Sequence, residues 1–218
     1  MKKVFGLAVG ITCLFASVGA YATTNPTGNL IVKGTIIPAA CSMSVSAGGV
    51  IDYGTIRANQ LSQTNFNPLA ERSTSLVVNC GTTPARFFLS VTDLRASSKV
   101  TGILGAGYTE AQNYGLGTYG GRRTGGYSVT LRNLTSNGVA LNPIVRSSKD
   151  AAWQASDGKV SQTPNQHSWR NGAVNAPASI SQLTGVIAVK AVINRASDLN
   201  LTGNIALDGH ATLVLDYI

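Results

Sequence analysis

Residues 211–217 read Ala-Thr-Leu-Val-Leu-Asp-Tyr, and residues 30–36 read Leu-Ile-Val-Lys-Gly-Thr-Ile. Each stretch alternates with a period of two residues, which is typical of a β-strand with one buried face. The inward face of the later stretch comprises Ala211, Leu213, Leu215 and Tyr217. The corresponding face of the earlier stretch comprises Leu30, Val32, Gly34 and Ile36. The chain is therefore expected to carry a strand near each end.

Between these two stretches the same period recurs in several short segments that are separated by turn residues. The clearest segments are 41–45, 50–56, 73–80, 87–91, 127–131 and 186–193. Asn137-Gly138 is a strong signal for a tight hairpin turn. Charged residues make up only 12% of the chain and there are 24 glycines. The pattern predicts eight to ten short strands in an all-β sandwich, with loops over 97–126 and loops with short edge strands over 149–178.

The first 22 residues have the pattern of a signal peptide. Lys2 and Lys3 precede an uncharged, mostly apolar run over 4–20, which ends in the small-x-small sequence Ala20-Tyr21-Ala22. We expect the protein to be exported through the inner membrane and its signal peptide to be cut after Ala22. The alternative is a membrane anchor, which is disfavoured because the run is short and no basic residues follow it. We therefore predict a signal peptide over 1–22, an extension over 23–37 and one β domain over 38–218.

Two cysteines, Cys41 and Cys80, remain once Cys13 leaves with the signal peptide. An even set of cysteines in an oxidising compartment is expected to pair. A bridge across a loop of this length stabilises a fold by about 4 kcal/mol in the chain-entropy model. Two cysteines and two scattered histidines offer too few ligands for a metal site, so no metal and no cofactor are expected.

The formal net charge is +8, and part of it belongs to the signal peptide. The remaining basic residues are scattered, and the closest cluster is Arg122-Arg123. Nucleic-acid binding requires a denser basic patch, so no nucleic-acid partner is expected. Binding to acidic surface sugars or to a negatively charged envelope stays open.

Several motifs suggest other chemistry by their letters alone. The stretch 115–120 matches a dinucleotide fingerprint, but Gly125-Gly126 and the residues before them cannot open the helix that such a site needs. His167 and His210 lack the nucleophile elbow and the order of a catalytic triad. The protein is therefore not expected to be an enzyme.

Trp153 and Trp169 lie in polar stretches and could stack on a sugar. Tryptophans in such positions more often anchor a loop on the core, and that interpretation is favoured here.

The chain resembles a chaperone–usher pilus (fimbrial) subunit. The resemblance is carried by 34–41 (Gly-Thr-Ile-Ile-Pro-Ala-Ala-Cys), by Cys80 at the end of a strand, and by 211–218 with its penultimate tyrosine. The stretches 50–56 and 114–118 resemble a fimbrial-like branch whose members are mostly uncharacterised.

The resemblance implies an incomplete immunoglobulin-like β-sandwich of the pilin type, which lacks its last strand, together with an N-terminal donor strand. In such a fold Leu30, Val32 and Ile36 would fill pockets in a neighbour, with Gly34 at a point of close backbone approach. The strand over 211–217 would form a wall of the groove and present Tyr217 to a periplasmic chaperone. The alternative for 30–36 is an ordinary first strand of its own domain.

The function expected from this resemblance is a structural subunit of a surface fimbria that supports adhesion. Its partners would be neighbouring subunits, a periplasmic chaperone, an outer-membrane usher and a host glycan or protein receptor. Three alternatives remain: a carbohydrate-binding fimbrial adhesin, a secreted β-sandwich enzyme, and a closed exported β-sandwich domain that uses its own first strand.

Overall fold

The computed structural model describes residues 30, 32–34 and 41–218. Contacts divide the chain into two units, Met1–Ile37 and Pro38–Ile218, and every described strand belongs to the second unit. The expected signal peptide and Ile36 lie outside the described residues. Among the residues described, no helix has the length and apolar character needed to cross a membrane.

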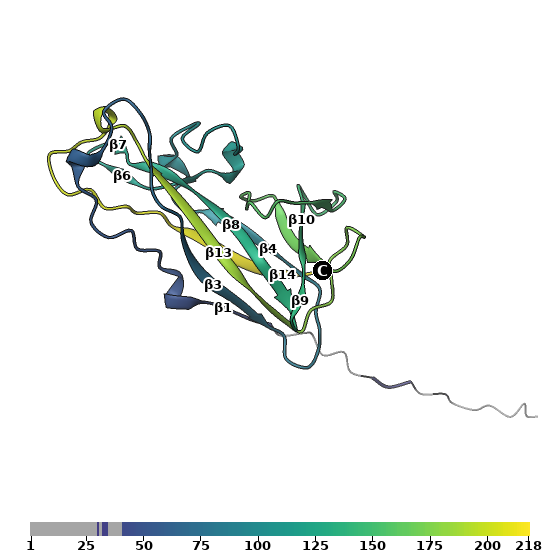
Figure 1. Ribbon diagram of the computed structural model, residues 1–218. Helices are drawn as coiled ribbons and strands as arrows, with labels where there is room; N and C mark the ends of the chain where they lie inside the picture. The colour runs from purple at the N-terminus through teal and green to yellow at the C-terminus, as the bar shows by residue number, and fades with distance from the viewer. Residues whose placement is uncertain (1–29, 31, 35–40) are drawn as a thin grey trace, which may run out of the picture. The chain divides into compact units, whose positions relative to one another are not determined.

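The larger sheet has seven strands, and β3, β13 and β8 lie side by side at its centre (Figure 1). Its main path is β1 (Ser42–Val45), β3 (Arg72–Asn79), β13 (Gln182–Ile193), β8 (Gly125–Ser136) and β5 (Tyr114–Gly115). Two short strands pair at the side, β2 (Asn67–Pro68) with β13 and β9 (Val139–Ala140) with β8. All of these pairings are antiparallel.

The second sheet has five strands and forms the other layer of the sandwich. Its order is β11 (Gln154–Ala155), β10 (Asn142–Arg146), β12 (Gln166–Arg170), β4 (Phe87–Asp93) and β14 (Ala211–Tyr217). A separate hairpin pairs β6 (Thr118–Tyr119) with β7 (Arg122–Arg123). The described helices are single 3₁₀ turns at Ser46–Gly49, Ala58–Gln60, Ala96–Ser98, Glu110–Gln112 and Ala196–Asp198.

The core lies between the two sheets and follows the predicted alternation. Inward-facing side chains from both layers form one buried cluster, which includes Leu76, Val78, Phe87, Leu89, Val91, Val129, Leu131, Ile187, Val189 and Ala191. The prediction of an all-β, immunoglobulin-like sandwich is confirmed. The predicted Asn137-Gly138 hairpin is also present, with Ser136 paired to Val139 across the turn.

The region 97–126, expected to be loops, contains the short strands β5, β6 and β7. Two further local predictions are wrong. The stretch 50–56, expected to be a strand, has no strand partner among the described residues, and Gly54 interrupts it with a φ of +68°. The stretch 166–170, expected to be loop or a short edge strand, is the internal strand β12. The side chain of Trp169 is completely buried, and its ring packs edge to face against the ring of Phe87, with 5.8 Å between the two ring centroids. His167, which shares a face with Trp169, is polar, so no apolar alternation marks β12 in the sequence.

The predicted disulfide is present. Cys41 and Cys80 are joined by an S–S bond of 2.07 Å, which ties the start of β1 to the end of β3. This bond fixes the point at which the chain enters the sandwich.

Candidate strand-binding groove

One wall of the candidate site is β14, an edge strand of the five-stranded sheet. It pairs with β4 along its whole length, from Ala211 opposite Asp93 to Tyr217 opposite Phe87. In the described part of the chain, its other edge has no strand partner. Its inner row, Ala211, Leu213 and Leu215, is only half-buried although it packs against the core. An unpaired edge with an apolar row is a ready template for another strand.

The opposite wall is formed by β1 and the extended segment 51–57 that follows it. The inward side chains Met43, Val45, Ile51 and Tyr53 pack against the same core and are also half-buried. Over 51–56, no main-chain group makes a backbone–backbone hydrogen bond within the described residues. Both walls of this groove therefore present unpaired main-chain groups beside a partly covered apolar core.

Tyr53 holds the second wall in place. Its hydroxyl donates to Val189 O at 2.9 Å and accepts from Ala191 N at 3.2 Å, both on β13. Burial raises the pKa of this phenol, and the hydrogen bond from Ala191 opposes that shift. The tyrosine thereby satisfies two main-chain groups of β13 at a place where a paired strand would otherwise do so.

A cavity of about 780 Å³ occupies one end of the groove. It lies between the segment 51–61 and the segment 199–207, which leads into β14. Its aliphatic lining includes Ile51, Ile56, Leu199, Ile205 and Leu207. A cavity of this size and character can hold several residues of an extended apolar chain.

The other end of the groove is bridged by a single hydrogen bond. The backbone N–H of Cys41, just before β1, donates a hydrogen bond to the hydroxyl of Tyr217 at the end of β14. The distance between the nitrogen and the oxygen is 2.6 Å. The two walls therefore converge at the disulfide end and diverge toward the cavity.

Arg95 and Asp208 position the chain just before β14. Arg95 Nε lies 2.7 Å from Asp208 Oδ2 and Nη2 lies 3.1 Å from Oδ1. The hydrogen bonds with Arg95 lower the pKa of the Asp208 carboxyl, and those with Asp208 raise the pKa of the guanidinium. Asp208 N also donates to Leu116 O at 3.0 Å. Because the ion pair is exposed, its effect is mainly to orient the segment rather than to stabilise the fold.

The predicted site residues divide between the two units. Ala211, Leu213, Leu215 and Tyr217 all lie on the wall formed by β14, as described above. Leu30 and Val32 are 91% and 87% exposed, and a Cβ added to Gly34 would meet no atom within 4 Å. The units are described separately, so the roles of Leu30, Val32, Gly34 and Ile36 as a donor strand stay a prediction.

Some parts of the groove were missed at the sequence level. Tyr53 and Ile51 were interpreted as members of an ordinary strand, because their alternation is that of any half-buried strand. We expected residues 197–204 to turn the chain and made no prediction for 205–207. Leu199, Leu201, Ile205 and Leu207 nevertheless give this region an apolar content that could have indicated a buried face.

The residues considered for other chemistry do not come together. His167 is buried on β12, and its Nε2 lies 2.9 Å from Ser161 O and 3.1 Å from Ser161 N. Burial lowers the pKa of this imidazole. His210 is exposed just before β14. Within the described ranges, no group of three or more His, Cys, Asp or Glu side chains could hold a metal ion.

The two tryptophans behave as anchors. Trp153 packs against the guanidinium of Arg146, whose Cζ lies 4.6 Å from the ring centroid. The same guanidinium lies over Phe88 on β4 at 5.6 Å. Trp169 is inaccessible in the core, so the hypothesis that it stacks on a sugar is wrong.

Comparisons with known proteins find a family model, a relative and a solved structure to which this chain is similar. A family model described as "Protein of unknown function (DUF1120)" matches residues 30–122. The uncharacterised protein YhcF of Escherichia coli K12 is 24% identical over 212 residues, covering 86% of this chain and 89% of that protein. The chain is therefore similar to proteins whose own functions are not characterised.

A search of solved structures finds a chain from a chaperone–usher pilus, in a study of rod uncoiling. It is 20% identical, with a TM-score of 0.38, and the match covers 90% of this chain and 100% of that one. At this level of likeness we take no detail of the pilus structure over to this chain.

Proposed function

We propose that this protein is a structural, non-enzymatic subunit of a surface fimbria, which assembles when an extended strand from a neighbouring subunit fills the groove between β14 and the segment 51–57. A periplasmic chaperone would occupy the groove first, and an outer-membrane usher would organise the exchange. The protein would pass through the periplasm to the cell surface and contribute to adhesion there.

The observation that carries the proposal is the pair of facing, unpaired walls. A strand inserted between β14 and the segment 51–57 would form main-chain hydrogen bonds on both of its edges and cover the half-buried apolar row of β14. Strand addition of this kind takes affinity from the main chain and specificity from alternate side chains. An empty groove with two open edges would otherwise invite aggregation.

The expected donor stretch fits this groove in length and pattern. Residues 30–36 number seven, as does β14, and an extended strand of that length spans about 24 Å. Burying Leu30, Val32 and Ile36 would contribute on the order of 5–8 kcal/mol before ordering costs. Gly34 would lie at a point where the backbone of the donor strand approaches the backbone of a groove wall closely.

The positions of the two ends favour a donor that runs antiparallel to β14. Ile36 is five residues from Cys41, so the donor's own domain must stand close to the end of the groove where Ile36 lies. The acceptor's own extension leaves from Cys41, beside Tyr217. If Ile36 occupies the cavity at the opposite end, successive subunits join head to tail. Such a heterologous contact, which does not close on itself, generates a filament.

The test is substitution on the donor stretch, because it leaves the groove untouched. Leu30→Asp and Val32→Asp should abolish fibres in electron micrographs of cells that carry the complete assembly system, because a charge would enter an apolar groove. Binding of the variant subunits to the chaperone should persist.

The matched control is Thr35→Asp, which places the same charge on the opposite face of the stretch and should leave fibres largely intact. Fibres of normal length in the Leu30→Asp and Val32→Asp variants would contradict the proposal.

A further inference from the structure

A second, smaller cavity lies away from the groove, on the outer face of the seven-stranded sheet. It has a volume of about 310 Å³ and is lined by two walls and a floor. One wall is Phe66 and Pro68, around β2, and the other is the stretch from Ile103 to Tyr108 in the glycine-rich region 97–126. The floor is Lys190 and Val192 of β13. The strand-exchange proposal uses none of these residues.

Lys190 gives this otherwise apolar cleft a single charge of its own. Two other cations contact the aromatic rings that line the cleft. Arg195 Cζ lies 4.7 Å from the ring centroid of Phe66, and Lys159 Nζ lies 4.9 Å from the ring centroid of Tyr108. Both already have carboxylate partners, Asp198 and Asp157 respectively.

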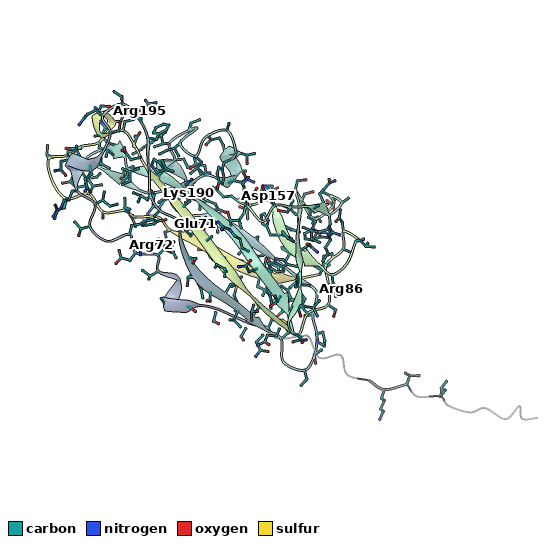
Figure 2. All side chains as sticks on the ribbon, in the orientation of Figure 1. Glu71, Arg72, Arg86, Asp157, Lys190 and Arg195 are labelled. Carbon is teal, nitrogen blue, oxygen red and sulfur yellow. A yellow bond between two sulfur atoms is a disulfide. The ribbon has the colours of Figure 1, made fainter. Side chains whose placement is uncertain are left out.

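Lys190, in contrast, takes part in none of the ion pairs found among the described residues. Val189 of β13 pairs with Arg72 of β3, so Glu71 is the residue across from Lys190; both are labelled in Figure 2, and the Glu71 carboxylate is bonded to Arg132. The cleft thus combines apolar and aromatic walls with a free ammonium group at its floor.

We propose that this cleft binds a carboxylated pyranose, a sugar ring that bears an acid group, such as a uronic or sialic acid. The carboxylate would meet Lys190, a charge-assisted contact of the kind a lysine makes as a point charge. The C–H face of the ring would lie against Phe66 or Tyr108, and ring hydroxyls would reach the Tyr108 hydroxyl or water. A volume near the lower limit for ligand sites fits one sugar ring rather than a long chain.

The proposal adds a binding activity to the structural role and is independent of it. The cleft is not part of the groove, so strand exchange along a fibre would leave its lining residues available on each subunit for this second role. Weak binding at each subunit would then be multiplied along the fibre.

The test is saturation-transfer NMR on the mature chain 23–218, in whatever assembled or chaperone-bound form it is recovered. The probes are glucuronic acid and N-acetylneuraminic acid, with glucose and benzoate as the neutral-sugar and non-sugar acid controls. The acid sugars should bind, and glucose and benzoate should bind much more weakly. Lys190→Gln should weaken binding of the acid sugars about fivefold, as expected for a partly exposed charge pair. Lys149→Gln, at an exposed loop lysine, should not change binding.

Tyr108→Ala is a second variant, which removes an aromatic side chain from the cleft and leaves the charge of Lys190. It should weaken binding of the acid sugars and reduce the saturation transferred to their ring protons. Binding of both glucuronic acid and its methyl glycoside would support a sugar at the end of a glycan. Binding of the free acid alone would support a free monosaccharide in the same cleft. Equal binding of glucose, preference for benzoate, or an unchanged Lys190→Gln variant would overturn the proposal while leaving the assembly proposal untouched.

Discussion

His167 is a buried ionisable side chain whose environment disfavours the charged form, because burial lowers its pKa. It faces the core from β12, and its imidazole is held by the main chain of Ser161 rather than by a carboxylate. Burial lowers its pKa, so the native state resists protonation that the unfolded chain accepts. A buried histidine without an acidic partner therefore links folding stability to pH.

The sign of this linkage gives the first prediction. The unfolded histidine titrates at about pH 6.5 and the native one below that value, so stability is complete above pH ~6.5 and falls as the pH drops. In urea titrations at about pH 7.5 and pH 5, the wild type should lose more stability than His167→Gln, which cannot titrate. Equal losses in the two proteins would contradict this account.

Individual residues also mark the limit of prediction from sequence. The alternation of Phe87, Leu89 and Val91 or of Ile187, Val189 and Ala191 located strands correctly, because an apolar side chain at every second position forms a continuous face only on an extended chain. The packing of Trp169 on the core was expected, but the internal strand that carries it was missed. Only His167 and Trp169 of β12 face the core, and two residues are too short a pattern to recognise. Which half-buried rows lie on open edges is set by the whole topology, so the groove could be anticipated only through a family resemblance.

At the scale of elements, the disulfide joins two strands that are already paired. Ser42 to Val45 of β1 pair with Asn79 to Leu76 of β3, and the bond closes the ladder at its outer end. β1 is short, and the segment that follows it has few backbone hydrogen bonds. The bond therefore holds the wall of the groove that has least support of its own.

Replacing both Cys41 and Cys80 by serine should lower the free energy of unfolding by about 4 kcal/mol, because the bond closes a loop with a sequence separation of 39 residues. Denaturant titration of the oxidised wild type and the double variant, under identical conditions, measures the difference. Reduced wild type should match the variant. A loss below about 1 kcal/mol would mean that β1 stays in place without the bond.

At the scale of the whole molecule, the sandwich is folded but incompletely covered. Its inner rows along β14 and the segment 51–57 stay half-buried, while the inward-facing side chains of the central strands, such as Leu76, Val129 and Ile187, are buried. A missing element of this kind should make the free subunit less stable than a closed sandwich of the same size, and should make its stability depend on whatever fills the groove.

A synthetic peptide of residues 28–37 should therefore stabilise the isolated mature chain. At a peptide concentration of about one hundred times Kd, mass action adds about 2.7 kcal/mol, which corresponds to a rise in Tm of roughly 5–10 °C for a domain of this size. Differential scanning calorimetry measures the rise. The same peptide with Val32→Asp is the control and should have little effect; equal shifts from both peptides would exclude a specific strand site.

The disulfide between Cys41 and Cys80, at the point where the extension leaves the domain, has a mechanical consequence under the proposed assembly. Tension along a fibre would reach each subunit through the extension that leaves at Cys41, and would leave it through the strand held beside β14. The disulfide would pass the load directly into β3, so β1 would not peel away. The inserted strand would be pulled along its own axis, and its ladder of hydrogen bonds would share the load in shear instead of breaking one at a time. A fibre built this way would withstand the pulling force of flowing liquid because its hydrogen bonds are loaded together, although no covalent bond joins its subunits.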